Sequence, residues 1–121
     1  MVKYFLDTYA MWEIINGNKS YADYLNEEIC TSIFNLYELY YNLIKETSED
    51  KAKEKFFFFK RFLIHFTDKE IFEASLFKLK YKKEDISYTD ALGYAIALEN
   101  GMKFLTGDIA FKNKANVEYV K

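Results

Sequence analysis

Short apolar runs alternate with longer amphipathic stretches along this chain. The β-prone runs occupy residues 2–6, 28–31, 63–66, 103–105 and 117–120. Between them, apolar residues recur at helical spacing over about 8–16, 20–25, 33–46, 50–62, 68–80 and 87–100. Strands that alternate with helices favour right-handed β-α-β units. We therefore expect an α/β fold, a three-layer α/β/α sandwich around a short, mainly parallel central sheet.

Capping residues mark several of the predicted helix ends. Ser32 precedes a long apolar helix, and Thr67-Asp68-Lys69-Glu70 has the order of a capping box. Gly101 supplies a left-handed end for the helix before it. The chain contains no proline, and no Gly/Ser-rich linker interrupts it. We expect a single domain over residues 1–121.

The composition excludes several classes of protein. One cysteine, Cys30, and one histidine, His65, allow neither an internal disulfide nor a Cys/His zinc site. Asp7 interrupts the first apolar run too early for a signal peptide or a membrane span. A net charge of −2 means that any contact with nucleic acid must be local. These features predict a cytoplasmic protein with no membrane contact.

Three acidic residues stand where the edge of a parallel sheet would gather them. Asp7 directly follows the first predicted strand, and Asp108 follows the strand at 103–105 by three residues. Asp90 lies in the first turn of the helix that leads into that same strand. Ligands bind at the carboxyl ends of strands in such sheets, so these acids are candidates for one site.

Glu38 is unusual because it lies in the middle of an apolar helix. Its neighbours three and four residues away are Phe34, Asn35, Tyr41 and Asn42, and none is a cation. A carboxylate buried there without a partner would be costly, so we expect it to meet a partner elsewhere in the fold.

Four carboxylates brought together without lysine or arginine would repel, and a divalent cation would relieve the repulsion. Oxygen ligands select Mg²⁺ or Mn²⁺, which can activate a water for phosphodiester hydrolysis. Each acid also has a purely structural interpretation. Asp7 can end a strand, Asp90 can face a helix dipole, Asp108 can cap the last helix and pair with Lys112, and Glu38 can be exposed.

Four motifs occur in order along nearly the whole chain. They are Phe5-Leu6-Asp7-Thr8, Thr31-Ser32 followed by Glu38-Leu39, Tyr88-Thr89-Asp90-Ala91, and Leu105-Thr106-Gly107-Asp108 with Phe111 three residues on. This order resembles the PIN-domain ribonucleases of the VapC toxin type. Gly107 departs from the pattern, because asparagine or arginine is frequent there.

The resemblance implies a Mg²⁺- or Mn²⁺-dependent endoribonuclease that cleaves RNA. Its catalytic, metal-binding acids would be Asp7, Glu38, Asp90 and Asp108, with Thr106 as a supporting hydroxyl. The resemblance to the toxin branch also implies a homodimer and a small antitoxin protein as partner.

Other functions compete with this prediction. A haloacid dehalogenase-type phosphatase needs a second aspartate two residues after the first, and Tyr9 stands there. A receiver-like signalling domain needs an acidic pair that is absent around Asp7. A catalytically silent PIN-like domain that binds RNA or acts as a scaffold stays open, because the presence of the acids does not prove turnover.

Aromatic residues raise a separate expectation. Four consecutive rings, Phe56–Phe59, cannot all face one core from a helix, so some must be exposed or covered by a partner. We favour an interface there, with a second copy or with an antitoxin. His65, Cys30 and Trp12 are expected in the core.

Overall fold

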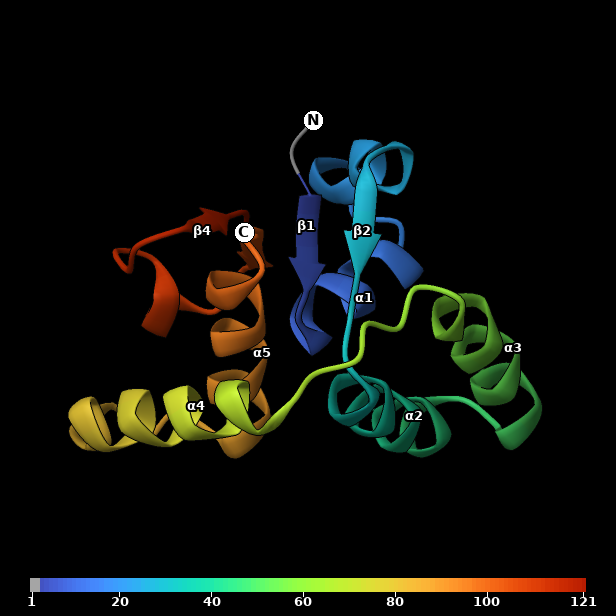
Figure 1. Cartoon of the computed structure of the whole chain (residues 1–121). Coiled ribbons are helices and arrows are strands. Elements are labelled where there is room, and N and C mark those ends of the chain that lie inside the picture. The colour runs from blue at the N-terminus through green and yellow to red at the C-terminus, as the bar shows by residue number, and fades with distance from the viewer. Residues whose placement is uncertain (1–2) are drawn as a thin grey trace.

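The computed structural model describes residues 3–121. The elements follow the chain in the order β1 (Lys3–Leu6), α1 (Thr8–Ile15), η1 (Lys19–Asn26), β2 (Glu28–Cys30), α2 (Ile33–Glu46), α3 (Glu49–Lys60), α4 (Asp68–Lys80), η2 (Lys82–Glu84), α5 (Tyr88–Glu99), β3 (Lys103–Thr106), η3 (Ile109–Phe111) and β4 (Val117–Tyr119), where η marks a 3₁₀ helix. Helices separate the strands as predicted, but α2, α3, α4 and α5 follow one another over residues 33–99 with no strand between them (Figure 1).

The central sheet has four strands in the order β2-β1-β3-β4. All three pairings are parallel, and Leu6 of β1 lies beside Leu105 of β3. The chain enters the sheet at β1 and places later strands on both sides of it. Such a reversal of strand order opens a crevice at the carboxyl ends of the strands.

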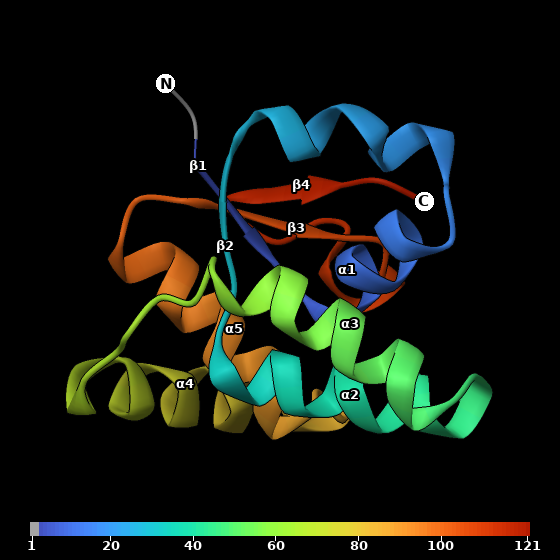
Figure 2. The same cartoon turned by 90° about the vertical axis from the view of Figure 1, so that its right-hand side faces the viewer.

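Alternate residues of the strands face two different hydrophobic cores. Phe5 and Phe104 pack with the residues of α4 and α5 on one face. Leu6 and Leu105 pack with α1, η1, α2 and α3 on the other. The two-residue period of a strand explains why neighbours in sequence enter different cores. The predicted three-layer α/β/α arrangement is confirmed, and Figures 1 and 2 show the helices around the sheet.

Three helix termini meet at the carboxyl end of the sheet. In Figure 1 the arrowheads of β1 and β2 point toward α2, and α1 begins directly after β1. Helix α5 runs back against the strands, so its first turn lies at this same end. Candidate residues from distant parts of the sequence can therefore approach one another here.

Helix starts follow the predicted capping residues in most places. The Ser32 side chain accepts a hydrogen bond from the backbone N–H of Asn35 at the start of α2. The backbone N–H and hydroxyl of Thr67 both donate to the Glu70 carboxylate, as the capping box predicts. The short stretch predicted over 20–25 is a 3₁₀ helix that Asn18 caps.

The strand predicted over 63–66 is wrong. Only one bridge forms there, between Leu63 and Thr31, just past the end of β2. Because β2 is a three-residue edge strand, it offers no longer ladder for this segment to join. The predicted core position of His65 is also wrong, because its side chain is exposed.

The phenylalanine run divides between core and surface. Phe59 is buried, Phe56 is partly buried, and Phe57 and Phe58 are exposed. The expectation that the four rings cannot share one core is confirmed. Cys30 is buried as predicted. No helix within residues 3–121 is long and apolar enough to cross a membrane.

Candidate active site and metal centre

Asp7 and Asp108 lie at the carboxyl ends of two adjacent parallel strands. The backbone N–H of Asp7 donates to the carbonyl of Leu105, at 3.3 Å, which ties the end of β1 to β3. Asp108 follows β3 by two residues and caps η3 through Ala110. The sheet order therefore brings the ends of β1 and β3 together, as predicted.

Asp7 is a buried carboxylate held by two hydrogen-bond donors. One oxygen, Oδ1, accepts from the backbone N–H of Ala10 at 2.8 Å and so caps α1. The other, Oδ2, accepts from the hydroxyl of Thr106. That hydroxyl in turn accepts from the backbone N–H of Asp108 at 3.0 Å. Thr106 therefore links the ends of β1 and β3 beside the first acid.

Burial, together with the smaller effects of the Asp90 and Asp108 charges, raises the pKa of Asp7 from 3.8 to about 8. The hydrogen bonds from Thr106 and Ala10 oppose that rise, because they favour the charged form. A group so placed is poised to lose its proton when a positive charge arrives.

Asp90 and Glu38 face the same cleft from two helices. Asp90 lies in the first turn of α5, whose cap is Ser87, and Glu38 lies in α2. Burial raises the pKa of Asp90 to about 6, and the charges of Glu38 and Asp108 add to the shift. Both acids are half-buried. Each of the four acids thus lies within electrostatic range of at least one of the others.

No cation balances these carboxylates within the part of the chain that the structure describes. The ion pairs over residues 3–121 join Lys55 to Glu54, Lys69 to Glu99 and Lys114 to Glu84. In particular, Lys112 does not pair with Asp108. The purely structural pairing considered for that acid is absent among the described residues.

The four acids surround the region without closing into one tight cluster. Among residues 3–121, no three His, Cys, Asp or Glu side chains lie close enough to hold one ion together. The carboxylates still influence one another's pKa values, because charges act over longer distances than coordination bonds. The arrangement of the acids is therefore open.

A cleft of about 340 Å³ leads away from the acids between α1 and α2. Its lining residues are Thr8, Tyr9, Trp12, Glu38, Asn42, Lys45, Glu46 and Asp90. The cleft thus joins two of the candidate acids to a surface with aromatic and basic side chains.

The comparisons with known proteins identify the family and support the fold. The family model described as "PIN domain" matches residues 4–117. The chain belongs to the PIN domain family. PIN domains are typically nucleases and generally depend on metal. No curated protein matches the sequence.

Solved structures of VapC toxins share the fold over nearly the full length. VapBC2 from Rickettsia felis, bound to a DNA fragment from its promoter, is 25% identical, covers 98% of both chains and has a TM-score of 0.77. DNA-bound VapBC from Salmonella typhimurium is 17% identical, covers 99% of this chain and 98% of that chain, and has a TM-score of 0.78. VapC20 of Mycobacterium tuberculosis, a sarcin-ricin loop cleaving toxin, is 18% identical, covers 98% and 99%, and has a TM-score of 0.76. The predicted family resemblance is confirmed.

The donor set of this PIN domain fits a hard divalent ion. The candidate ligands are all carboxylates, with a threonine hydroxyl beside them and no thiol or imidazole. Mg²⁺ keeps several waters and is usually held by one or two carboxylates directly. An open arrangement of acids therefore suits a hydrated Mg²⁺ or Mn²⁺ better than a fully protein-ligated ion.

Gly107 is required by the packing of Tyr9 in this PIN domain. A Cβ at residue 107 would lie 2.1 Å from a Tyr9 ring carbon and 2.6 Å from the carbonyl oxygen of Val120. The aromatic ring occupies the space that a longer side chain at 107 would need. The departure noted in the sequence is thus explained by the neighbouring tyrosine.

Asn35 and Trp12 were not assigned to the site from the sequence. Asn35 is fully buried and accepts from the hydroxyl of Ser32 at 2.7 Å while donating to Thr8 at 3.3 Å. Trp12 is only half-buried: it packs against the core and lines the cleft, so its predicted core role is incomplete. The signal for Asn35 was its position one helical turn before Glu38.

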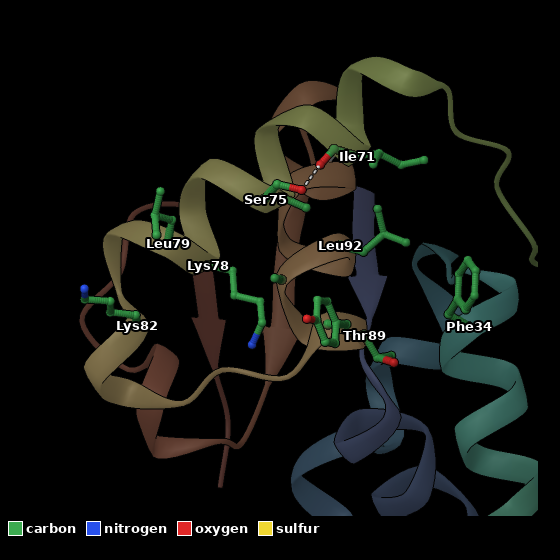
Figure 3. A pocket seen from close by; sticks show the side chains of 11 residues that line it. Phe34, Ile71, Ser75, Lys78, Leu79, Lys82, Thr89 and Leu92 are labelled. Atoms are coloured by element: carbon green, nitrogen blue, oxygen red, sulfur yellow. Dashed lines mark hydrogen bonds between the residues drawn. The ribbon is translucent and has the colours of Figure 1, made fainter.

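A larger groove lies between α4 and the start of α5, and Thr89 and Ala91 on either side of Asp90 line it (Figure 3). Its volume is about 480 Å³, and Phe34, Ile71, Leu79 and Leu92 contribute to its lining. No carboxylate lines it. This groove offers apolar contact area but no group for hydrolysis.

Proposed function

We propose that this PIN domain is a Mg²⁺- or Mn²⁺-dependent endoribonuclease, acting in the cytoplasm as the toxin of a VapBC-type pair. The observation that supports the proposal is that Asp7 and Asp108 follow adjacent parallel strands while Asp90 and Glu38 line one cleft, and none of the four forms an ion pair among residues 3–121. The family and the VapC-like fold support the same chemistry.

The four acids and Thr106 would have different roles, which follow from their positions. Asp7 is the candidate ligand that Ala10 and Thr106 hold by hydrogen bonds. Asp108 and Asp90 approach from β3 and α5, and Glu38 faces the cleft from α2. When bound, the ion would bind a phosphate oxygen and lower the pKa of a coordinated water. The carboxylates would hold the ion and accept hydrogen bonds from its waters, and Thr106 keeps Asp7 in place.

RNA cleavage tests the proposal. Wild-type protein should cut a 5′-labelled single-stranded RNA in Mg²⁺ and stop when a chelator is added. Asp7→Asn and Glu38→Gln should each lower the rate about 100-fold or more, because each removes several kcal/mol of transition-state stabilisation. Asp50→Asn, a change at an exposed acid in the first turn of α3, is the matched control.

The alternative, a silent PIN domain that binds RNA, predicts different results. Under that alternative, the wild type and the two variants bind intact RNA with similar affinity and none of them cuts it. Rates of Asp7→Asn and Glu38→Gln equal to that of Asp50→Asn would remove these residues from the chemistry.

We also propose a small antitoxin as partner and a homodimer as the assembly. Relatives were crystallised as toxin–antitoxin complexes, including one from Klebsiella pneumoniae. Exposed apolar side chains such as Phe72 and Leu76 of α4 and Phe57 of α3 give the molecule uncovered contact area. Light scattering after size exclusion should report a mass of twice 14.5 kDa. A mass of 14.5 kDa at all concentrations would contradict the homodimer.

A further inference from the structure

The cleft beside the acids has two walls of different chemistry. Helix α1 contributes the rings of Tyr9 and Trp12, and α2 contributes the polar side chains of Asn42, Lys45 and Glu46. Glu38 and Asp90 line the same cleft. The aromatic wall and the basic residue therefore belong to the same space as the proposed chemistry.

The residues of α2 lie on one face of the helix. Glu38, Asn42 and Lys45 are spaced by four and three residues, which places them along one stripe. At a rise of about 1.5 Å per residue, Lys45 lies roughly 10 Å beyond Glu38. A nucleic-acid strand with one phosphate at the acids can thus extend toward the lysine.

Trp12 lies on the opposite wall of the cleft, and its indole ring can make further contacts. It is half-buried, its indole N–H donates to no protein acceptor, and it forms no aromatic pair within residues 3–121. Tyr9 beside it is held against Gly107 and lies 6.4 Å from the ring of Tyr21. The wall is therefore anchored at Tyr9, whereas the indole is available to a ligand.

Asn42 and Lys45 also lack competing partners in the described part of the chain. Asn42 makes no side-chain hydrogen bond there, and Lys45 makes no ion pair, although its Nζ lies 5.4 Å from the centre of the Tyr41 ring. An amide can read the edge of an unstacked base, and an ammonium can bind a phosphate.

We propose that Trp12 is a stacking platform for one nucleobase of single-stranded RNA, with Asn42 contacting the base edge and Lys45 a flanking phosphate. Grooves that bind single strands combine aromatic rings with basic residues in this way. The inference rests on the proposed ribonuclease function and adds the part of the site that holds the substrate. A protein segment is the other candidate occupant, and the experiment separates the two.

Trp12 is the only tryptophan of the chain, so its fluorescence reports directly on the cleft. The probe is a short single-stranded RNA titrated in Mg²⁺ into Asp108→Asn, which should leave the RNA intact and changes no residue that lines the cleft. We expect quenching of Trp12 emission. The comparison is a series of RNAs that each carry one abasic nucleotide at a different position. One RNA of this series should bind about 5- to 150-fold more weakly than the intact RNA.

Variants test the contacts in the same Asp108→Asn background. Trp12→Phe should keep most of the affinity, and Trp12→Leu should lose about 5- to 150-fold, since stacking needs an aromatic ring. Lys45→Gln should reduce the slope of log affinity against log salt by about 0.7, which corresponds to one phosphate contact. Tyr37→Leu changes an exposed ring of α2 that does not line the cleft and should have no effect. If Trp12→Leu fails to fold, the series of abasic RNAs still tests the stacking, because it is measured on protein that retains Trp12.

Three results would overturn the inference. They are unchanged Trp12 emission at saturating RNA, equal affinity for the intact and all abasic RNAs, and quenching by a tetra-arginine peptide but not by RNA. The last result would assign the cleft to a protein segment. Quenching by RNA that the wild type never cuts would instead leave the binding site in place and contradict the nuclease.

Discussion

The single buried aspartate at the end of β1 decides much of the chemistry at the residue scale. Asp7 is 2% exposed and receives its hydrogen bonds from Ala10 and Thr106. A charge in that position is destabilising unless a cation approaches, because no lysine or arginine pairs with it within residues 3–121. The buried Asp7 carboxylate therefore lowers the stability of the fold at the place where the proposed ion would bind.

This cost predicts a pH dependence in the absence of metal. The pKa of Asp7 is about 8 in the folded state and near 3.8 in the unfolded chain, so the folded state binds the proton more tightly. The resulting stabilisation is fully present below pH 3.8 and is lost as the pH rises through about 8. Asp7→Asn should therefore unfold at a higher temperature than the wild type at pH 9, by about 4–8 °C per kcal/mol, and show little gain at pH 4.

Thermal unfolding followed by circular dichroism in a chelator checks this prediction. Asp50→Asn, at an exposed position, should show no comparable pH-dependent gain. A difference between Asp7→Asn and the wild type that stays constant from pH 4 to 9 would mean that ionisation of this carboxyl does not limit stability.

Helix α2 is the element that brings Glu38 to the site. Its first turn is tied to α1 by a buried polar network of Ser32, Asn35 and Thr8. Thr8 directly follows Asp7, and Glu38 follows Asn35 by one helical turn. The network therefore sets the distance between the first acid and the acid of α2.

Removing Asn35 should weaken that connection. Asn35→Ala leaves the hydroxyls of Ser32 and Thr8 with a lost partner in a buried place, which should lower the free energy of unfolding by about 1–3 kcal/mol. Urea unfolding measures the change. Asn26→Ala, an exposed position at the end of η1, is the matched control and should change stability by about 0.5 kcal/mol or less. Equal midpoints for the two variants would show that the network contributes little.

The whole molecule gathers its acids from four separate elements. Asp7, Glu38, Asp90 and Asp108 follow or belong to β1, α2, α5 and β3. An ion bound among them links both hydrophobic cores, since α5 packs on one face of the sheet and α2 on the other. Ion binding should therefore stabilise the whole fold, not one loop.

Thermal unfolding with and without Mg²⁺ tests that linkage. At a concentration 100-fold above its dissociation constant, Mg²⁺ should add about 2.7 kcal/mol to the free energy of unfolding. Na⁺ at matched ionic strength separates ion binding from general screening of the acids. The gain should shrink in Glu38→Gln and at pH 4, where protons compete for the carboxylates. An equal gain from Na⁺ and Mg²⁺ would argue against a specific site.

Local pattern was sufficient to predict most elements and the acids that follow them. The period of apolar residues and the caps at Ser32 and Thr67 act over a few residues, so they can be read without the fold. The same holds for Asp7 and Asp108 at strand ends, because parallel strands present their carboxyl ends at one edge. The strand predicted over 63–66 does not form, because a strand needs a neighbouring strand and only Thr31 pairs with this segment.

By itself, the sequence determined the alternation of strands and helices, the order of the acids and the membership of the PIN family. Only the tertiary structure decided that α1 and α2 enclose a cleft, that Tyr9 requires Gly107, and that Trp12 faces both core and cleft. The reason is physical: periodicity and capping arise between neighbours in the chain, whereas a cleft and its contacts arise from packing between segments far apart in it.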